Sequence, residues 1–149
     1  MQARNFVVID LETTGTQPGI DEIIEIGAVK ILNGQAADSF HTFVKPGQRL
    51  SLGIQRLTGI RDSDLEGQLR IQEVLPELLQ FVGDLPVAAH NASFDIGFLT
   101  AALGRPFTRH WLDTLELARI VFPLAPNYRL SGLAQQLGLG GSGFHRALN

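Results

Sequence analysis

The sequence predicts an α/β fold built on a mixed, five-stranded sheet. Residues 6–44 contain three strand-like segments in succession, and the rest of the chain alternates helix-like and strand-like segments. This order is typical of α/β proteins with a mixed sheet. The 149 residues fit one domain, and no internal repeat or linker divides them.

The three segments near the N-terminus have the composition of strands. Phe6–Ile9 is an apolar run, residues 21–32 are rich in β-branched side chains, and residues 36–44 alternate apolar and polar side chains. Asn33-Gly34 is a strong signal for a two-residue hairpin turn between the last two segments. We therefore expect a three-stranded meander.

The remaining segments are expected to alternate between helices and strands, from their apolar spacing and terminating glycines. The expected helices are 54–60, 71–82, 94–103, 114–122 and 130–137, and the expected strands are 86–89 and 111–112. Pro76 should break, kink or restart the second of these helices. Asp113 is expected to cap the fourth helix rather than to bind a metal.

Composition and charge exclude several classes of protein. Without cysteine the chain has neither disulfides nor thiolate metal sites. No apolar run approaches the roughly 20 residues of a membrane span, and the N-terminus shows no signal peptide, so we expect a cytoplasmic protein without membrane contact. A net charge of −3 argues against a broad nucleic-acid-coating surface. Arg49, Arg56 and Arg61 could line a nucleic-acid path, with scattered surface charge as the alternative.

A carboxylate pair follows the first strand, in the segment 10–15 (Asp-Leu-Glu-Thr-Thr-Gly). Residues two apart in a strand face the same side, so Asp10 and Glu12 should point together from the strand's end. The two carboxylates repel each other, and bound Mg²⁺ or Mn²⁺ would relieve this repulsion. The alternatives are that Asp10 caps a turn, or that it is the nucleophile of a phosphatase-type Asp-x-Asp site, which normally has a second Asp where Glu12 stands.

Two further segments carry residues that are candidates for binding a cation or for acting as a general base. The segment 90–95 (His-Asn-Ala-Ser-Phe-Asp) follows the expected strand 86–89, and Asp95 falls in the first turn of a helix, where the macrodipole favours a carboxylate. Asp95 is therefore either a helix-start residue or a cation ligand together with Asp10. His145 follows a glycine-rich run and is either a solvated side chain or a general base.

Together, the segments 10–15, 90–95 and 145–149 resemble the motifs of the DEDD-type 3′–5′ exonucleases. The resemblance is to the branch with a histidine in its third motif, which includes the proofreading epsilon subunit of bacterial DNA polymerase III. Residues 57–60 and 113–115 also resemble family positions, so the resemblance spans almost the whole chain. It implies a ribonuclease H-like fold, with helices flanking the mixed five-stranded sheet, and a single exonuclease domain over residues 1–149.

The third motif departs from the family pattern. In the family it reads histidine, four residues, aspartate, whereas here the sequence runs His-Arg-Ala-Leu-Asn and stops at Asn149, one position before the aspartate. The stop also falls early in what should be the last helix. We therefore expect a domain that is truncated in this helix and that has weak activity or none.

The resemblance implies metal-assisted hydrolysis of the 3′-terminal phosphodiester of single-stranded DNA, in proofreading or repair, by two Mg²⁺ or Mn²⁺ ions roughly 3.5–4 Å apart. It assigns Asp10 to both ions, Glu12 and Asp95 to one ion each, and His145 to the proton of the attacking water. The residues implied for substrate binding are Leu11, Thr13, Thr14, Leu57, His90, Asn91 and Phe94. Core packing is the alternative for Leu57 and Phe94, and His41 is expected to be an outward-facing strand residue.

Two rival functions remain open at this point. One is an RNA 3′-end trimming enzyme of the same branch, similar to ribonuclease T or oligoribonuclease, because DNA and RNA differ to the protein mainly in the 2′-hydroxyl. The other is an inactive exonuclease fold used as a binding module. The implied partners are a single-stranded 3′ end and a polymerase or helicase, either as a separate subunit or as a fused domain.

Overall fold

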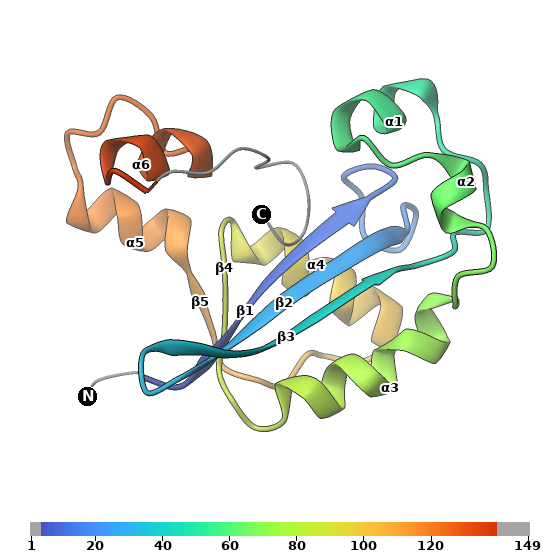
Figure 1. The fold of residues 1–149 in the computed structure, drawn as a ribbon, viewed down its shortest axis with the longest axis horizontal. Coiled ribbons are helices and arrows are strands. Elements are labelled where there is room, and N and C mark those ends of the chain that lie inside the picture. Colours follow the sequence, from blue (N-terminus) through green and yellow to red (C-terminus); the bar gives the residue numbers. More distant parts are fainter. Residues whose placement is uncertain (1–3, 140–149) are drawn as a thin grey trace.

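The computed structural model describes residues 4–139, and a five-stranded sheet in the order β3-β2-β1-β4-β5 forms its centre (Figure 1). β1, β2 and β3 pair antiparallel, whereas β4 lies parallel to β1 and β5 parallel to β4. The mixed five-stranded sheet predicted from the sequence is therefore confirmed. The strands are β1 (Phe6–Thr13), β2 (Ile23–Leu32), β3 (Gln35–Phe43), β4 (Val87–Ala89) and β5 (Trp111–Asp113).

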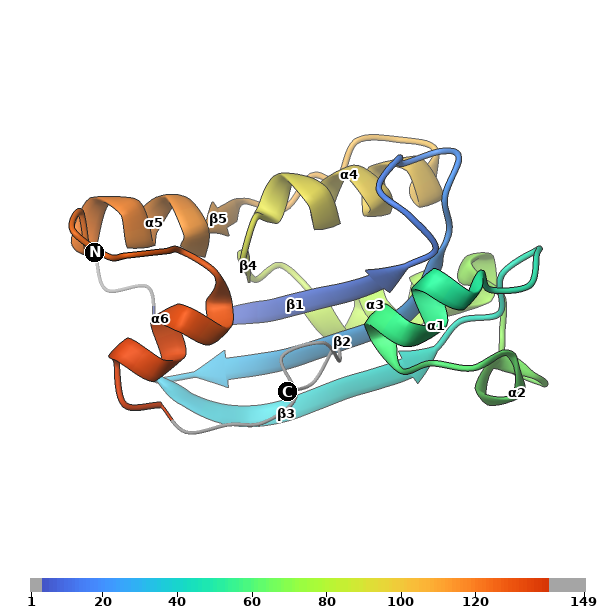
Figure 2. The same cartoon turned by 90° about the horizontal axis from the view of Figure 1, so that it is seen from above.

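Helices lie on both faces of this sheet. The helices of the described part are α1 (Leu52–Thr58), α2 (Asp62–Leu65), α3 (Ile71–Val82), α4 (Ala92–Leu103), α5 (Thr114–Val121) and α6 (Leu130–Gln136). α3 and α4 cover one face, whereas α1 and α6 lie over opposite ends of the other face (Figures 1 and 2). Within residues 4–139, no helix has the length and apolar character needed to cross a bilayer.

The main hydrophobic core lies between the sheet and the helices α3 and α4. On β1 the buried side chains Val7, Ile9 and Leu11 alternate with Val8 and Asp10, which point to the other face. Because side chains alternate along a strand, the apolar set that packs the core also fixes which face receives the intervening residues. The core thereby orients the acidic side chains of β1 away from α3 and α4.

Local signals in the sequence account for several turns. Asn33 and Gly34 both have positive φ, 54° and 80°, which a two-residue hairpin turn of this kind requires. Gly59 and Gly104 end α1 and α4 in the left-handed region, where glycine carries no Cβ penalty. The predicted hairpin and the predicted end of α4 are confirmed, whereas α1 ends at Thr58, two residues before the predicted end.

Two expectations from the sequence need correction. β1 continues to Thr13, because β2 pairs with it along its whole length, so Asp10 and Glu12 lie within the strand and not beyond it. Pro76 does not interrupt α3, which runs unbroken from Ile71 to Val82. Pro76 is exposed, and the buried apolar residues around it hold α3 on the sheet; burying several such side chains outweighs the roughly 3 kcal/mol cost of an internal proline.

Candidate active site

The face of β1 opposite the core carries the two predicted carboxylates. Asp10 and Glu12 share this face, and the antiparallel register places them directly opposite Gly27 and Glu25 of β2. Side chains directly opposite in an antiparallel pair lie on the same face of the sheet. The local β-structure therefore gathers Asp10, Glu12 and Glu25 on one face.

Asp95 reaches the same region from α4. Its carboxylate is 3% exposed, and its Oδ1 accepts a hydrogen bond of 3.1 Å from the backbone N–H of Leu11. The N–H of Val7 donates to β4's edge at Pro86, and alternate N–H groups of a strand point to the same side, so the Leu11 N–H also points toward β4. β4 ends before it can pair there, and Asp95 supplies the acceptor instead. Asp95 is thus held against the backbone that links Asp10 to Glu12.

Burial and mutual repulsion disfavour the charged forms of two of these carboxylates. The pKa of Asp95 is raised to about 8, first by burial and then by the charge of Asp10. The pKa of Asp10 is raised to about 6, again first by burial and then by the charge of Glu25, although solvent reaches part of the residue. Carboxylates with pKa values raised in this way are those that a bound cation would return to the ionised form.

Asp113 organises the start of α4 as well as that of α5. Its carboxylate accepts hydrogen bonds from the backbone N–H groups of Asn91, Ala92 and Leu115, at 2.8–3.0 Å. The predicted cap of α5 is confirmed. Asn91 has a positive φ of 66° and its own side chain caps nothing, so Asp113 satisfies the helix start that carries Asp95. Asp113 therefore links the start of α4 to the start of α5 by hydrogen bonds.

Several predicted substrate-binding residues make local hydrogen bonds in the structure. The ring of His90 lies 3.1 Å from the hydroxyl of Thr114 and 2.8 Å from the carbonyl oxygen of Tyr128, so it ties α5 to the segment before α6. Thr13 donates its hydroxyl to the carbonyl of Gly15. The hydroxyl of Thr14 accepts the N–H of Glu22. The contacts of Thr13 and Thr14 shape the loop after β1.

The apolar members of the predicted set divide into core and surface. Leu11 is buried in the main core, so the part of it that faces the site is its backbone N–H. Phe94 is half-buried, with its ring 4.9 Å from that of Phe98, and packs on the same core. Leu57 is 61% exposed on α1, which excludes the core alternative considered from the sequence.

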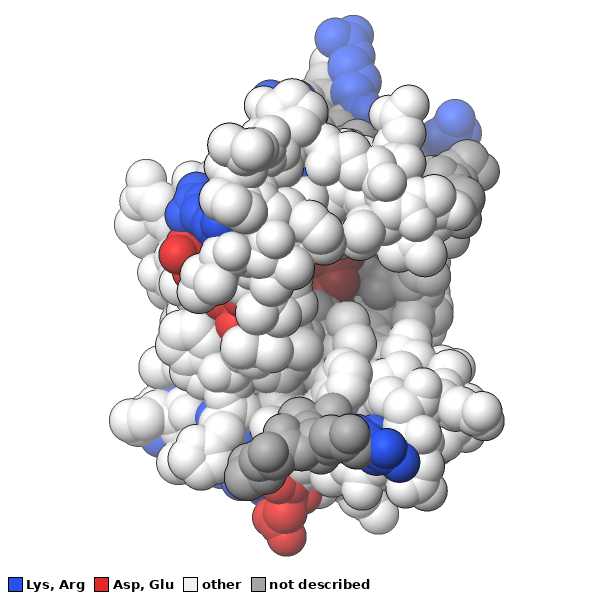
Figure 3. Space-filling view, turned by 90° about the vertical axis from the view of Figure 1, so that its left-hand side faces the viewer, with Lys and Arg blue, Asp and Glu red and all other residues white. Residues whose placement is uncertain are grey.

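A cavity of about 450 Å³ lies over the acidic face, between the sheet and the starts of α5 and α6. Asp10 and His90 line it together with apolar residues of β1 and β2, whereas Glu12 and Asp95 do not. Figure 3 shows a largely uncharged surface with an acidic patch recessed in a central hollow, and side chains of both charges toward the margins. An apolar cavity with few polar groups is the usual form of a ligand site.

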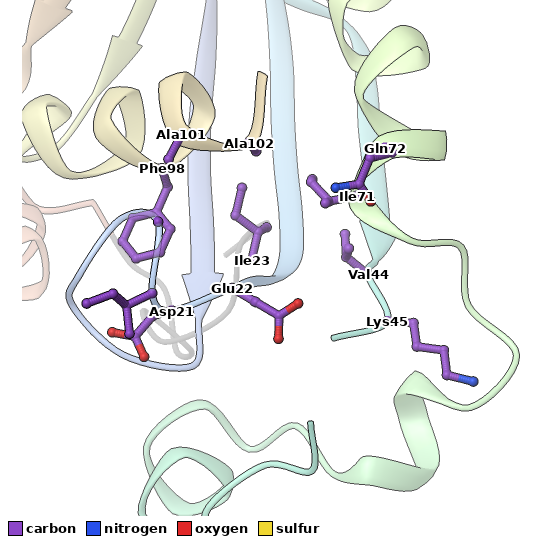
Figure 4. A pocket seen from close by; sticks show the side chains of 12 residues that line it. Asp21, Glu22, Ile23, Val44, Lys45, Ile71, Gln72, Phe98, Ala101 and Ala102 are labelled. Carbon is purple, nitrogen blue, oxygen red and sulfur yellow. The ribbon is translucent and has the colours of Figure 1, made fainter. Parts of the chain in front are cut away.

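A second cavity, of about 210 Å³, lies between the loop after β1, α3 and α4 (Figure 4). Its acidic side chains are engaged in holding loops: Asp21 accepts the N–H of Gln17 and Glu22 accepts the N–H of Gly47. The acidic residues of this cavity are therefore explained by their hydrogen bonds to the loops. None of the carboxylates predicted to be catalytic lines it.

The carboxylates of Asp10, Glu12 and Asp95 offer oxygen ligands, which suit a hard divalent cation such as Mg²⁺ or Mn²⁺. Within residues 4–139, however, no three acidic or histidine side chains are gathered closely enough to form a finished metal site. Ionised carboxylates repel one another without a cation between them. Asp10 and Asp95 are the two groups that the structure couples, Glu12 shares the face, and the predicted general base His145 lies outside the described residues.

One neighbouring pair was not predicted from the sequence to belong to the site. Glu25 is 1% exposed, and the Nε2 of His41 lies 2.6 Å from its Oε1. The side chain of His41 is partly exposed, as expected for an outward-facing residue. Its contact with Glu25 on the acidic face was not predicted from the sequence. The available signal was the single charged residue inside the apolar run Ile23–Ile26, which an ordinary buried strand would not contain.

Sequence comparison identifies relatives across nearly the whole chain. The family model described as Exonuclease, of the RNase T type, matches residues 7–149. A PolC-type DNA polymerase III from Thermotoga maritima is 46% identical over 148 residues, which cover 97% of this chain and 11% of that protein. The epsilon subunit of DNA polymerase III from Aquifex aeolicus is 43% identical over 147 residues, which cover 96% of this chain and 73% of that subunit. The chain thus spans about a tenth of the polymerases and most of the free subunit.

Solved structures agree with this family. Exonuclease X in complex with 5′-overhanging duplex DNA superimposes with a TM-score of 0.77 and 26% identity, over 92% of this chain and 75% of that one. The zinc-bound complex of E. coli exonuclease I with single-stranded DNA superimposes with a TM-score of 0.86 at 19% identity, over 98% of this chain and 37% of that one. The fold is ribonuclease H-like, and the chain belongs to the exonuclease family.

Proposed function

We propose that this chain is a 3′–5′ exonuclease domain that hydrolyses the terminal phosphodiester of single-stranded DNA with two Mg²⁺ or Mn²⁺ ions. The observation that carries the proposal is the contact between Asp95 and the β1 backbone, which brings a buried carboxylate from α4 to the acidic strand. The raised pKa values of Asp10 and Asp95 support it, because burial and then neighbouring negative charge disfavour the ionised forms that a cation would stabilise.

In this proposal the acidic face holds the cations, which would polarise the scissile phosphate and lower the pKa of a bound water. Asp10 would help to hold both ions, Glu12 the one that activates water, and Asp95 the one that stabilises the leaving group. His145 accepts the proton of the water. These four roles follow the family resemblance.

The residues proposed for substrate binding follow the family resemblance as well. Exposed Leu57 packs against the terminal base, while the backbone and hydroxyl groups of Thr13 and Thr14 contact the terminal nucleotide. His90 and Asn91 are proposed to contact the substrate, and Leu11 and Phe94, which pack on the core, to support these contacts from within. With a net charge of −3 the domain would grip only a few phosphates, which fits a substrate bound by its end.

The names of the relatives suggest replication and proofreading as the biological setting. PolC-type polymerases and an epsilon subunit are among them, so we propose that the domain acts beside a polymerase, as a subunit or as part of a longer polypeptide, in the cytoplasm. RNA 3′-end trimming is the second candidate, because the matching family model is of the RNase T type.

A matched pair of oligonucleotides tests the proposal. Single-stranded DNA and RNA of the same sequence, each 5′-labelled, are incubated with the chain and Mn²⁺. Consistent with the weak activity expected from the sequence, we expect a slow ladder that shortens from the 3′ end of the DNA, faster than that of the RNA, and its loss in Asp10→Ala. Faster degradation of RNA would favour trimming, and absence of cleavage despite Mn²⁺ binding would favour a binding module.

A further inference from the structure

Buried Glu25 and partly exposed His41 form a hydrogen-bonded pair beside the candidate metal ligands. Glu25 is almost fully buried on β2, and the Nε2–H of His41 on β3 donates to its Oε1 at 2.6 Å. His41 remains partly exposed, with its ring edge against the ring of Phe43 at 5.4 Å. The carboxylate of Glu25 is therefore held in one place by its neighbour.

The sheet register places this pair beside the proposed ligands. Glu25 lies directly opposite Glu12, while Gly27 lies between Asp10 on one side and His41 on the other. All of these positions share one face of the sheet, since opposite residues in antiparallel strands point the same way. The charge of Glu25 is felt at Asp10, where it contributes to the raised pKa of that carboxyl.

The burial of Glu25 lowers the stability of the fold. A carboxylate loses its hydration on burial, and a like charge directly opposite on the next strand is destabilising. Its sequence neighbours Ile24 and Ile26 show that β2 otherwise packs aliphatic side chains. Replacing a buried carboxylate by an apolar side chain is often neutral or stabilising, so Glu25 calls for a reason other than stability.

We propose that Glu25 is a positioning residue of the metal site. Fixed by His41, its negative charge strengthens the attraction of the Asp10–Glu12 strand for a divalent cation without entering the coordination sphere. This inference rests on the proposed function, because it gives a role to a residue beside the proposed cation. Residues in the layer behind metal ligands act in this way, and their mutation typically costs about 10–100-fold in metal affinity.

Two substitutions separate charge from shape. Glu25→Gln keeps the size and an acceptor for His41 but removes the charge, whereas Glu25→Asp keeps the charge but shortens the side chain. The dissociation constant for Mn²⁺ is measured from the electron paramagnetic resonance signal of the free ion, well below the unfolding temperature, and the melting temperature is measured without metal. We expect Glu25→Gln to weaken Mn²⁺ binding about tenfold and Glu25→Asp to weaken it less than threefold. Glu25→Asp, but not Glu25→Gln, should lower the metal-free melting temperature.

Glu77→Gln is the matched control, because Glu77 is an exposed residue of α3, on the covered side of the sheet. It makes the same change in net charge and should leave the Mn²⁺ affinity unchanged. A purely structural role would make affinity follow melting temperature, so weaker binding by Glu25→Asp than by Glu25→Gln overturns the inference. If Glu25→Gln does not fold, Glu25→Asp decides alone: affinity near that of the unmodified chain supports the inference, and a tenfold loss contradicts it.

The proposed function can fail separately from this inference. Absence of Mn²⁺ binding in the unmodified chain, or equal binding in Asp10→Ala, would remove the metal site itself. Normal metal binding with an unaffected Glu25→Gln variant would leave the exonuclease proposal standing and reject only the role of Glu25.

Discussion

The backbone N–H of Leu11 donates a 3.1 Å hydrogen bond to the carboxylate of Asp95, a residue 84 positions away in the sequence. This contact joins the acidic strand β1 to the first turn of α4. It also fixes the orientation of Asp95, because an acceptor held by a backbone N–H cannot rotate away without leaving that donor unpaired inside the protein. The relationship explains how two motifs that are remote in sequence become parts of one site.

Replacing Asp95 by Asn should remove catalysis while keeping the fold. The amide oxygen can still accept the Leu11 N–H, but the negative charge offered to a cation is lost. Stabilisation of transition-state charge by a metal is worth several kcal/mol, so the cleavage rate should fall by about 10³-fold. The rate is measured on a labelled single-stranded DNA, and Asp84→Asn, at an exposed acidic residue, is the control. More than a tenth of the activity remaining in Asp95→Asn would remove Asp95 from the proposed ligand set.

The stability of the metal-free protein should fall as the pH rises from about 4 to about 8. Folded Asp95 keeps its proton up to its raised pKa of about 8, whereas the unfolded carboxyl loses it near its ordinary pKa of 3.8. Between these values the folded state binds more protons, so increasing pH favours unfolding. Asp10, with a pKa of about 6, adds to the effect over the lower part of the range.

Thermal unfolding at pH 5 and pH 8.5, with and without Mn²⁺, measures this effect. We expect the metal-free melting temperature to drop by roughly 5–10 °C, which corresponds to about 2 kcal/mol for a domain of this size. Mn²⁺ binds the ionised carboxylates and should reduce the drop. Asp95→Asn should flatten it as well, and an equally steep dependence in that variant would contradict the assignment to Asp95.

The sequence predicted the elements whose signals are local. Asn33-Gly34 marks its hairpin because few other residues accept two successive positive φ angles, and Asp113 marks the start of α5 because its carboxylate accepts a nearby N–H. The order of strands and helices then leads to the mixed sheet. The one-turn helix α2 was not predicted, since four residues carry too little periodicity to recognise.

Relationships that depend on register were not predictable in the same way. The pairing of Glu25 with His41 requires β2 and β3 to align so that His41 lies opposite Gly27, and a shift by one residue would turn His41 to the other face. The second role of Asp113, on Asn91 and Ala92, depends on the parallel pairing of β4 with β5. Side-chain spacing alone does not contain this information.

Asp113 offers a test of how far a cap contributes to the site. Asp113→Ala removes the acceptor of three backbone N–H groups and should destabilise the protein by about 2–3 kcal/mol. Ser51→Ala removes the N-cap acceptor of α1 and should cost about 1 kcal/mol. Only Asp113→Ala should also weaken Mn²⁺ binding in the folded protein, because it frees the start of the helix that carries Asp95. Unchanged Mn²⁺ affinity would limit Asp113 to a structural role.

Leu57 and Leu52 are two exposed leucines on α1, at 61% and 70% exposure, and α1 lies beside the end of β1 in both views (Figures 1 and 2). Burial explains neither residue, so truncating either one to Ala should leave the melting temperature within about 1 °C. If Leu57 packs against the terminal base, its removal takes away apolar contact with the substrate. Full burial of a leucine side chain is worth about 1.5–3 kcal/mol, and contact along one side contributes part of that. We therefore expect Leu57→Ala to raise the KM for single-stranded DNA about five- to tenfold, with kcat nearly unchanged, because the contact is made in the ground state and in the transition state alike.

Leu52→Ala should leave both constants unchanged. Equal increases in KM for the two variants would indicate a nonspecific apolar surface on α1, and a fall in kcat alone would place Leu57 in the alignment of the scissile bond and not in substrate binding.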